Sequence, residues 1–538
     1  MTKPKTIRRV MRTTKLTLER LDDRCLMAGI TPNDPLFVRQ WGMEDIQAPN
    51  AWEITTGSTL VTVAVLDTGI DYSHPDLYLN IWVNQEEIPR EIRRNLLDID
   101  GDDLITFWDL NDERNQGPGK ITDLSGNGRI DGGDLLRPVG AGGWADGRDD
   151  GHNGYEDDLV GWDFLDGDND PMDVNAHGTI DAGIIGAVGN NGEGVAGLNW
   201  RCQLMPVRFF PRTDNLALEE IEAAVSAAPD AIRYAVDNGA HLSNNSWGGG
   251  VPVSILRPDL LPPILAAIEH AEAAGHLMVF SAGNDSTNID NDPRLPQFWH
   301  APNIISVAAT TRLDQLASFS NFGETSVDLA APGERIWSTT IQGSFPVGST
   351  GTQYNFGTGT SMAAPHVAGT AALILARNPE LSYVEVKELI LENVDPLPDL
   401  AGKMVSGGRL NTFRALSAMS ATSLPLSPRD VGGMQGSQSL STPLVNPPPP
   451  ASPEQGEQDR TDVFAVEIHD TGRLRHPTRT IGGQFVRTWI IDAGAAGSRA
   501  YDTNAVRLAA DAHFAQWAVN NEPLRLSGVL FRRGRYKR

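Results

Sequence analysis

Residues 60–66 (LVTVAVL) place the strongest constraint on the fold of this chain. The run is almost continuously apolar, rich in β-branched residues, and followed directly by Asp67. A strand that is apolar on both faces belongs inside a parallel sheet that is covered by helices on both sides. Functional residues in such sheets gather at the carboxyl ends of the strands, which is where Asp67 would lie.

Strand and helix patterns alternate further along the chain. The expected strands are 202–210, 241–245, 277–281 and 304–308, and the expected helices are 230–238, 261–274, 362–376 and 382–394. Ser382 and Glu385 form a capping box at the start of the last helix. This alternation predicts a three-layer α/β sandwich with a central, mostly parallel sheet.

The chain has 538 residues, which is too long for one compact core. We expect five parts. They are an N-terminal export-type segment at 1–29, a main domain at 30–421, an acidic insertion within it at 85–148, a Ser/Pro-rich linker at 422–460, and a C-terminal appendage at 461–538 of unassigned role. The short lead-in before residue 60 contains Trp41 and Trp52, which we expect to pack on the main domain.

Charge and composition exclude several classes of partner. The net charge of −25 argues against nucleic acid. Two cysteines are too few for a disulfide framework, and no run of 18 apolar residues could span a membrane. The N-terminus lacks the apolar core of a secretory signal. Its LTLERLDDRCLMAG stretch resembles a motif on large exported bacterial proteins, which implies an extracellular or cell-surface location.

Four stretches carry residues suited to serine chemistry. Ser361 lies in GTGTSMAAPHVAG, at the positive N-terminal end of a buried helix in which we expect Pro365 to fall in the first turn. Asp67 lies in VLDTGID, His177 in NAHGTIDAG and Asn284 in FSAGND. Each is unremarkable alone, but the order Asp, His, Asn, Ser is specific, since few chain orders build a catalytic triad.

With these motifs, residues 36–415 resemble the subtilisin-like serine proteases (subtilases), apart from the acidic insertion. The resemblance implies an exported serine endopeptidase that acts on polypeptides. It makes Ser361 the nucleophile and His177 the general base. Asp67 would orient the imidazole, and Asn284 would join the Ser361 backbone N–H in an oxyanion hole. It also implies two substrate-binding segments, Ser246, Trp247 and Gly248 on one side and Ser281, Ala282 and Gly283 on the other.

The stretch after His177 departs from the family pattern. Ile180 and Asp181 replace a His-Val pair, and Asp181 lies four residues after His177, so both can share one helix face. A carboxylate there could raise the pKa of His177 or coordinate a ligand. A second hypothesis is therefore a catalytically weak, subtilase-like scaffold that acts as a calcium-dependent binding module.

The acidic insertion has the spacing of two EF-hand calcium loops. The first offers Asp98, Asp100, Asp102 and Asp109, and the second Asp123, Ser125, Asn127 and Asp134. The second has Gly128 at the sixth position, where the first has Asp103. The pair resembles the loops of dockerin modules, which implies a possible partner module, although stabilisation of the fold is the favoured role.

A third acidic cluster, GWDFLDGDNDPM, resembles a calcium loop of the subtilases. This resemblance implies that the calcium ligands are Asp163, Asp166, Asp168, Asp170 and the carbonyl of Met172. Because all these ligands are hard oxygen atoms, Ca²⁺ suits them better than zinc. The alternative for each cluster is a solvated, self-repelling acidic loop.

Overall fold

The computed structural model describes residues 29–211, 217–248, 254, 256–291, 294, 301–341 and 353–419, and the backbone of four strands between 465 and 532. The chain divides into two units, Met1–Gly433 and Met434–Arg538. The expected linker lies outside the described residues, as does the export-type segment except for residue 29.

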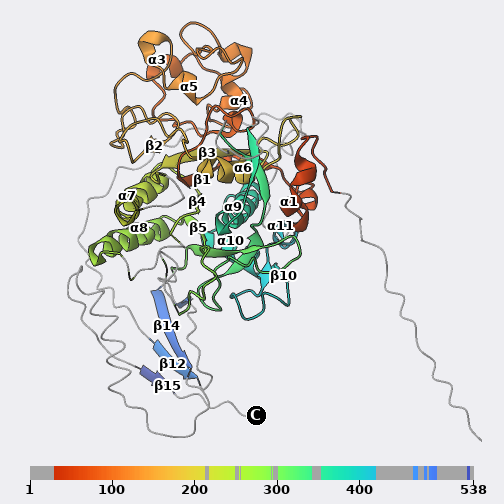
Figure 1. Ribbon diagram of the computed structural model, residues 1–538. Helices are drawn as coiled ribbons and strands as arrows, with labels where there is room; N and C mark the ends of the chain where they lie inside the picture. The colour runs from red at the N-terminus through yellow and green to blue at the C-terminus, as the bar shows by residue number, and fades with distance from the viewer. Residues whose placement is uncertain are drawn as a thin grey trace, which may run out of the picture. The chain divides into compact units, whose positions relative to one another are not determined.

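A nine-stranded sheet forms the centre of the first unit, in the order β10-β11-β7-β6-β5-β4-β1-β3-β2 (Figure 1). Its strands are β1 (Gly57–Asp67), β2 (Trp162–Asp163), β3 (Arg201–Arg208), β4 (Leu242–Asn245), β5 (Leu277–Ser281), β6 (Ile304–Thr310), β7 (Leu329–Pro332), β10 (Asp395–Pro396) and β11 (Gly408–Arg409). Neighbours pair in parallel, except for β10 and β11. Two further strands, β8 (Ile336–Thr339) and β9 (Tyr354–Gly357), form an antiparallel pair.

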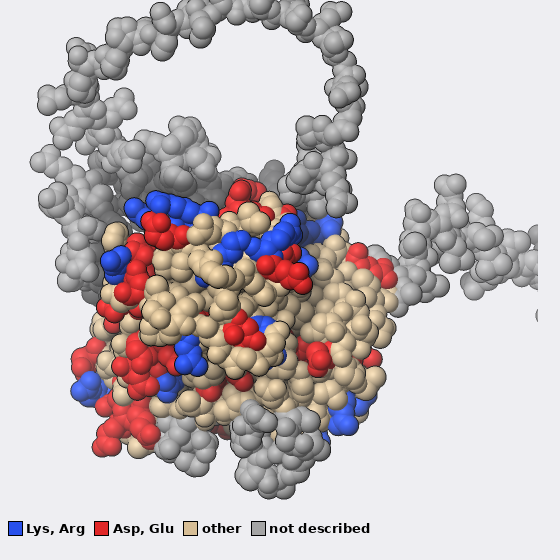
Figure 2. Space-filling view, turned by 90° about the horizontal axis from the view of Figure 1, so that it is seen from above, with Lys and Arg blue, Asp and Glu red and all other residues tan. Residues whose placement is uncertain are grey.

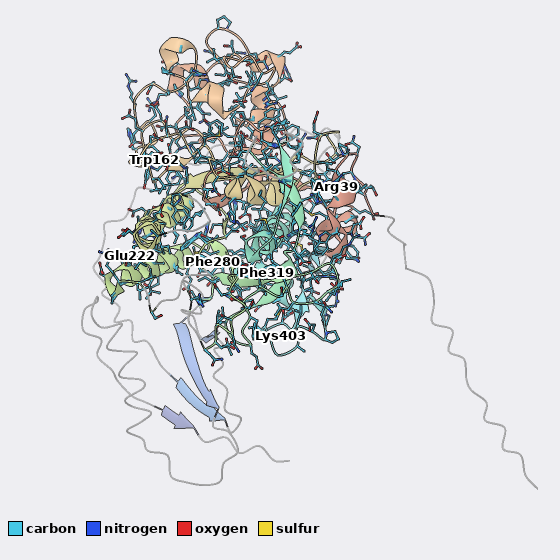
Figure 3. The ribbon with its side chains drawn as sticks, viewed as in Figure 1. Arg39, Trp162, Glu222, Phe280, Phe319 and Lys403 are labelled. Atoms are coloured by element: carbon cyan, nitrogen blue, oxygen red, sulfur yellow. The ribbon has the colours of Figure 1, made fainter. Side chains whose placement is uncertain are left out.

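Helices cover both faces of this sheet, which confirms the predicted three-layer fold (Figure 1). The longer ones are α6 (His177–Gly186), α7 (Leu218–Asp237), α8 (Leu261–Ala273), α9 (Thr360–Arg377), α10 (Tyr383–Glu392) and α11 (Thr412–Ser417). Alternate residues of β1 face opposite layers. Val63 and Val65 join the apolar cluster of α6 and α9, and Ala64 and Leu66 join that of α7 and α8. Figure 3 shows Phe280 of β5 in the interior, with Arg39, Glu222 and Lys403 at the periphery.

Most expected elements occur within a few residues of their predicted bounds, but α7 is longer than expected. It begins at Leu218 rather than at residue 230, and Pro229 lies inside it, buried. Because a proline usually ends a helix, the local sequence favoured a helix that begins only after Pro229. Burial of Ala224, Val225 and Ala228 holds the earlier turns on the sheet.

The N-terminal lead-in packs on the first unit as expected. It forms α1 (Trp41–Asp45) and α2 (Ala48–Ala51). Trp41 and Trp52 are both buried, and the indole N–H of Trp52 donates to the Leu198 carbonyl at 2.8 Å.

The acidic insertion is joined to the core of the first unit. It contains α3 (Arg90–Arg93), α4 (Phe107–Leu110) and α5 (Gly132–Leu135), which lie together at one end in Figure 1. Phe107, Leu135 and Trp144 are fully buried and belong to the same apolar cluster as β1. Figure 2 looks onto this end and shows groups of acidic side chains with basic ones between them.

The second unit contains a four-stranded sheet in the order β13-β14-β12-β15. Its strands are β12 (Ala465–His469), β13 (Thr478–Ile481), β14 (Gln484–Asp492) and β15 (Leu530–Arg532). Nothing in its backbone indicates a role. In the described part of the chain, no helix has the combination of length and apolarity needed to cross a membrane.

Candidate active site

Four predicted site residues lie at the ends of core elements. Asp67 is the last residue of β1, His177 the first of α6, and Ser361 the second of α9. Asn284 follows the end of β5. Asp67 and Ser361 are buried, whereas Asn284 is exposed. The ends of β1 and β5 and the starts of α6 and α9 therefore carry a carboxylate, an amide, an imidazole and a hydroxyl.

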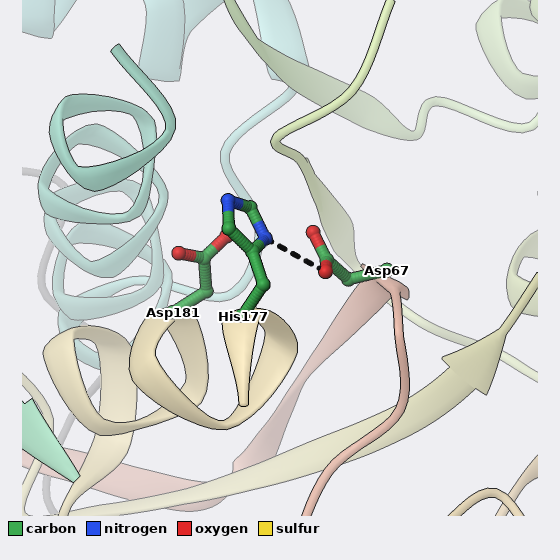
Figure 4. A group of neighbouring side chains, drawn as sticks. All are labelled: Asp67, His177 and Asp181. Carbon is green, nitrogen blue, oxygen red and sulfur yellow. Dashed lines mark hydrogen bonds and ion pairs between the residues drawn. The ribbon is translucent and has the colours of Figure 1, made fainter. Parts of the chain in front are cut away.

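His177 is held by Asp67 (Figure 4). Nδ1 of His177 lies 2.8 Å from Oδ1 of Asp67, and the backbone N–H of Thr68 donates to the same oxygen at 2.7 Å. With Nδ1 engaged, the other ring nitrogen, Nε2, is left to exchange a proton with a reacting group.

Asp173 supports this pair, and the sequence interpretation missed it. Its carboxylate is buried and accepts hydrogen bonds from Oγ1 of Thr179 at 2.6 Å and Oγ1 of Thr68 at 3.0 Å. Thr68 Oγ1 in turn accepts from the N–H of Gly178 at 3.0 Å. A Cβ at Gly178 would lie 2.1 Å from the Gly69 carbonyl, so the close approach requires glycine. The sequence did contain a signal for this role, because Asp173 lies just before the start of α6, where the positive end of a helix favours a negative charge.

The start of α9 explains how a helix carries Pro365 beside its serine. Pro365 is the sixth residue of α9 rather than part of its first turn, so the expectation about its position is wrong. Its missing N–H leaves the Ser361 carbonyl without its partner four residues on. The Ser246 hydroxyl donates to that carbonyl at 3.0 Å instead. The proline is tolerated because a neighbouring strand end supplies the donor.

Asn284 is oriented by the same helix start. Its Oδ1 accepts from the backbone N–H of Thr360 at 2.8 Å and from Thr360 Oγ1 at 3.0 Å, which leaves its Nδ2 available as a donor. Gly359 keeps the adjoining space open. A Cβ there would lie 2.8 Å from Ser361 Oγ and 3.4 Å from Asn284 Nδ2, so both atoms border the same small volume.

The two predicted substrate-binding segments lie on adjacent strands. Ser246–Gly248 follows β4. Ser281 is the last residue of β5, which pairs in parallel with β4, and Ala282 and Gly283 follow it. The indole of Trp247 is buried between Phe209 and Phe280, with ring centroids 5.2 and 5.3 Å away. Trp247 can therefore meet a substrate only through its backbone.

Asp181 lies beside His177 with no access to solvent (Figure 4). Its Oδ2 accepts from Nδ2 of Asn244 at 3.0 Å, and the same Nδ2 lies 3.0 Å from Ser246 Oγ. Its Oδ1 has no hydrogen-bond partner among the described residues. Burial raises the pKa of Asp181 well above its ordinary value. A chain of side chains thus links Asp181, through Asn244 and Ser246, to the backbone of Ser361.

The charge balance around His177 favours its protonated form. Burial disfavours the imidazolium and lowers the pKa, but the carboxylates of Asp67 and then Asp181 outweigh it and raise the pKa to about 9, against an ordinary 6.5. The described contacts contain no direct hydrogen bond between His177 and the Ser361 hydroxyl. Such bonds often tighten only when substrate is bound.

The two loops of the insertion share one local geometry. The first aspartate, Asp98 or Asp123, accepts from the backbone N–H groups three and five residues further on, and the last, Asp109 or Asp134, accepts from the N–H of the second loop residue, all at 2.6–2.9 Å. The sixth residues, Asp103 in the first loop and Gly128 in the second, both have positive φ, +69° and +87°. The first loop therefore turns as the second does despite lacking the glycine.

Only some of the side chains predicted to bind calcium in these two loops lie close together. Asp98, Asp100 and Asp109 each place an oxygen within 4.8 Å of the others. Asp102 instead accepts from Thr59 Oγ1 on β1 at 2.6 Å. In the second loop the Asn127 amide donates to Asp131 Oδ2 at 2.7 Å and Ser125 Oγ donates to Asp123 Oδ1 at 3.1 Å.

Arg208 occupies part of the third acidic cluster. Its guanidinium contacts the carboxylates of both Asp163 and Asp166. Asp170 accepts from the Tyr72 hydroxyl at 2.8 Å, and the backbone N–H of Asp170 donates to Asp168 at 3.1 Å. The protein itself therefore supplies positive charge where the sequence alone suggested calcium, at Asp163 and Asp166. Met172 is half-buried, and its N–H donates to Asp170 Oδ1 at 3.3 Å.

The fold and the site together define a class of protein. A carboxylate, an imidazole and a hydroxyl at converging element ends, with an amide donor beside them, can transfer an acyl group through a serine. Comparison with known proteins identifies the family. The Subtilase family model matches residues 58–415. The chain belongs to the subtilase family, and it is a subtilisin-like serine endopeptidase that acts on polypeptides.

Similar proteins include a thermophilic serine proteinase, thermitase and an extracellular protease. The chain is 30% identical to a thermophilic serine proteinase of Bacillus sp. strain AK1, over 72% of this chain and 70% of that protein. It is 30% identical to thermitase of Thermoactinomyces vulgaris, over 72% and 99%. An extracellular protease of Xanthomonas campestris pv. campestris shares 32%, over 74% and 58%. A lanthipeptide protease structure, 19% identical with a TM-score of 0.50 over 73% and 99% of the two chains, shares the fold.

Proposed function

We propose that this endopeptidase cleaves peptide bonds with Ser361 as nucleophile and His177 as its general base. The hydrogen bond between His177 Nδ1 and Asp67 Oδ1 carries the proposal, because it leaves Nε2 for proton transfer. Nε2 takes the Ser361 proton as Oγ attacks the substrate carbonyl, and it then protonates the leaving amine. Water releases the acyl group from Ser361 by the same proton path.

Asn284 Nδ2 and the backbone N–H of Ser361 would stabilise the oxyanion of the tetrahedral intermediate. Nδ2 is the donor left over once Asn284 Oδ1 accepts from Thr360, and it borders the space next to Ser361 Oγ. An extended substrate would pair with the backbone of Ser246–Gly248, with Ser281–Gly283 as the opposite wall. Main-chain pairing of this kind gives affinity with little side-chain selectivity.

A fluorophosphonate probe tests the nucleophile. We expect calcium-loaded protein to be labelled once, at Ser361, because the probe reacts only with an activated serine. Ser361→Ala should abolish labelling, and Ser318→Ala, which removes an exposed hydroxyl elsewhere, should leave it intact. Folded protein that fails to label would favour the second candidate, a catalytically weak, calcium-dependent binding protein. The fully buried Asp181 beside His177 is the observation that favours that candidate.

The acidity of His177 predicts an unusual pH profile. With its pKa near 9, His177 is largely protonated at neutral pH, so kcat/KM should rise with pH until the base form prevails. Asp181→Val removes a carboxylate that favours the imidazolium, so the acidic limb should move to lower pH by about one unit. Ile180→Val is the control on the same helix turn. An acidic limb that stays in place would show that Asp181 carries no charge that His177 senses.

The same pKa shift affects stability. Because the folded-state pKa of His177 exceeds the ordinary 6.5, its contribution is fully present below about pH 6.5 and is lost as pH rises through about 9.

We propose that calcium binds the insertion loops and stabilises the enzyme. The shared loop geometry and the close oxygens of Asp98, Asp100 and Asp109 support this. Asp102 reaches β1 through Thr59, so an ion in the first loop would be coupled to the strand that ends at Asp67. A dockerin-like contact with a partner module, and export to the cell surface or medium, complete the proposal. The extracellular relative supports export.

Chelation tests the calcium proposal. Removing an ion present at about 1,000 times its dissociation constant costs about 4 kcal/mol. For a domain of this size that lowers Tm by about 5–10 °C. We expect that drop in differential scanning calorimetry with a calcium chelator, its reversal by excess Ca²⁺, and little reversal by Mg²⁺. A Tm indifferent to chelator would contradict the proposal.

A further inference from the structure

The site beside Ser361 contains a group of three side chains that the peptidase reaction does not use together. Asp67, His177 and Asp181 each offer one ligand atom, and these three atoms lie within 4.8 Å of one another (Figure 4). They come from the end of β1 and from one face of α6. Proteolysis requires the Asp67–His177 pair, and nothing in that chemistry calls for a second carboxylate beside the ring.

An independent feature indicates a missing partner. Asp181 is 0% exposed, yet its Oδ1 has no hydrogen-bond partner among the described residues. Oδ1 of Asn244, on the amide that donates to Asp181, is likewise buried and unpaired. Two acceptor oxygens that lack donors are costly in a site shielded from water. A cation satisfies acceptor oxygens, whereas a further hydrogen-bond acceptor would not.

The donor set indicates which cation fits. One imidazole nitrogen and two carboxylate oxygens are typical ligands of Zn²⁺, which binds them at about 2.0–2.2 Å and leaves a fourth position for water. Calcium prefers six to eight oxygen ligands and does not suit this set. Ligand atoms already within 4.8 Å of each other need only small shifts to surround one zinc ion.

We propose that Asp67, His177 and Asp181 form a zinc site that switches the peptidase off. An imidazole nitrogen that binds Zn²⁺ uses its lone pair for the metal and cannot accept the Ser361 proton. If the bound nitrogen is Nδ1, Zn²⁺ displaces the Nδ1 proton of the imidazolium to solvent, and Nε2 keeps its N–H and has no lone pair left to accept the Ser361 proton. Only the inhibitory consequence rests on the proposed function, since metal binding itself does not require catalysis.

Calorimetry on Ser361→Ala protein tests binding without self-cleavage. The protein is saturated with Ca²⁺, so that oxygen-rich loops are filled, and is then titrated with Zn²⁺. We expect one site that is lost in Ser361→Ala/Asp181→Asn and retained in Ser361→Ala/Glu388→Gln, which removes one exposed carboxylate on α10. Asp181→Val repeats the test should the asparagine variant unfold, and Tm shows whether each variant is folded. Equal zinc binding with and without the Asp181 carboxylate overturns the proposal.

Inhibition of the active enzyme is the second readout. Zn²⁺ should inhibit reversibly, with recovery on adding a chelator selective for zinc over calcium. Since even outer-sphere partners of a metal are worth about 10- to 100-fold, Asp181→Asn should raise the half-inhibiting zinc concentration by at least that factor. An active enzyme that binds no zinc refutes this inference and leaves the proposed function standing. Folded protein that binds zinc but has no peptidase activity would support the zinc site and contradict the proposed function.

Discussion

Replacing His177 with alanine is expected to lower kcat by about 10⁶-fold, because the triad acts as a unit and the serine is a poor nucleophile without its base. Ser361→Ala should cost about the same. The double variant should lose no more than either single one, since the first substitution already disables the unit. The measurement is steady-state hydrolysis of a chromogenic peptide in calcium buffer.

The matched control is His152→Asn, which changes an exposed histidine of the first unit that already has positive φ. Its kcat should be unchanged, and the Tm of all variants should stay close to that of the parent. A His177→Ala enzyme that keeps a tenth or more of the parental rate would contradict the assignment of the general base.

Asn284→Ala is expected to lower kcat by about 10²–10³-fold while KM changes little. The amide would meet the oxyanion in the transition state rather than the ground-state carbonyl, so its loss affects the chemical step. Steady-state kinetics on the same peptide measure the two parameters separately. A loss confined to KM would instead place Asn284 in ground-state binding.

Asn284→Asp separates the donor from the scaffold. An aspartate can still accept from the N–H and Oγ1 of Thr360, as Asn284 Oδ1 does, so the start of α9 should remain in place. It cannot donate to an oxyanion and adds a negative charge beside it. We expect a kcat at or below that of the alanine variant with an unchanged Tm. Activity above that of Asn284→Ala would argue against the oxyanion role.

Local patterns predicted the elements that this site depends on. The apolar run that ends at Asp67 forms β1 at the centre of the sheet, and the capping box of Ser382 and Glu385 starts α10. Both signals are short-range: two-sided burial requires continuous apolarity, and a cap lies within four residues of its partner. The length of α7 escaped this reasoning because Pro229 acts locally as a helix breaker, whereas packing on the sheet decides the outcome.

Side-chain environments were harder to predict. Asp173, Thr68 and Thr179 form a buried network that orients the start of α6, and spacing alone did not single it out. The cluster around Asp163 had the composition of a calcium loop, yet Arg208 arrives from the end of β3 to pair with it. A charge contributed by another element cannot be found in the local motif.

The sequence by itself determined the mostly parallel α/β fold, the chemical types of the candidate triad residues, and the two loops with EF-hand spacing. Only the tertiary structure decided the environment of Asp181. Asn244 is 63 residues away in the chain, and Ser246 reaches Ser361 across 115 residues. Periodicity and motif spacing record interactions over a few residues. Which buried acceptors go unpaired depends on how distant elements pack, and here that packing leaves one carboxylate oxygen of Asp181, Oδ1, without a donor beside His177.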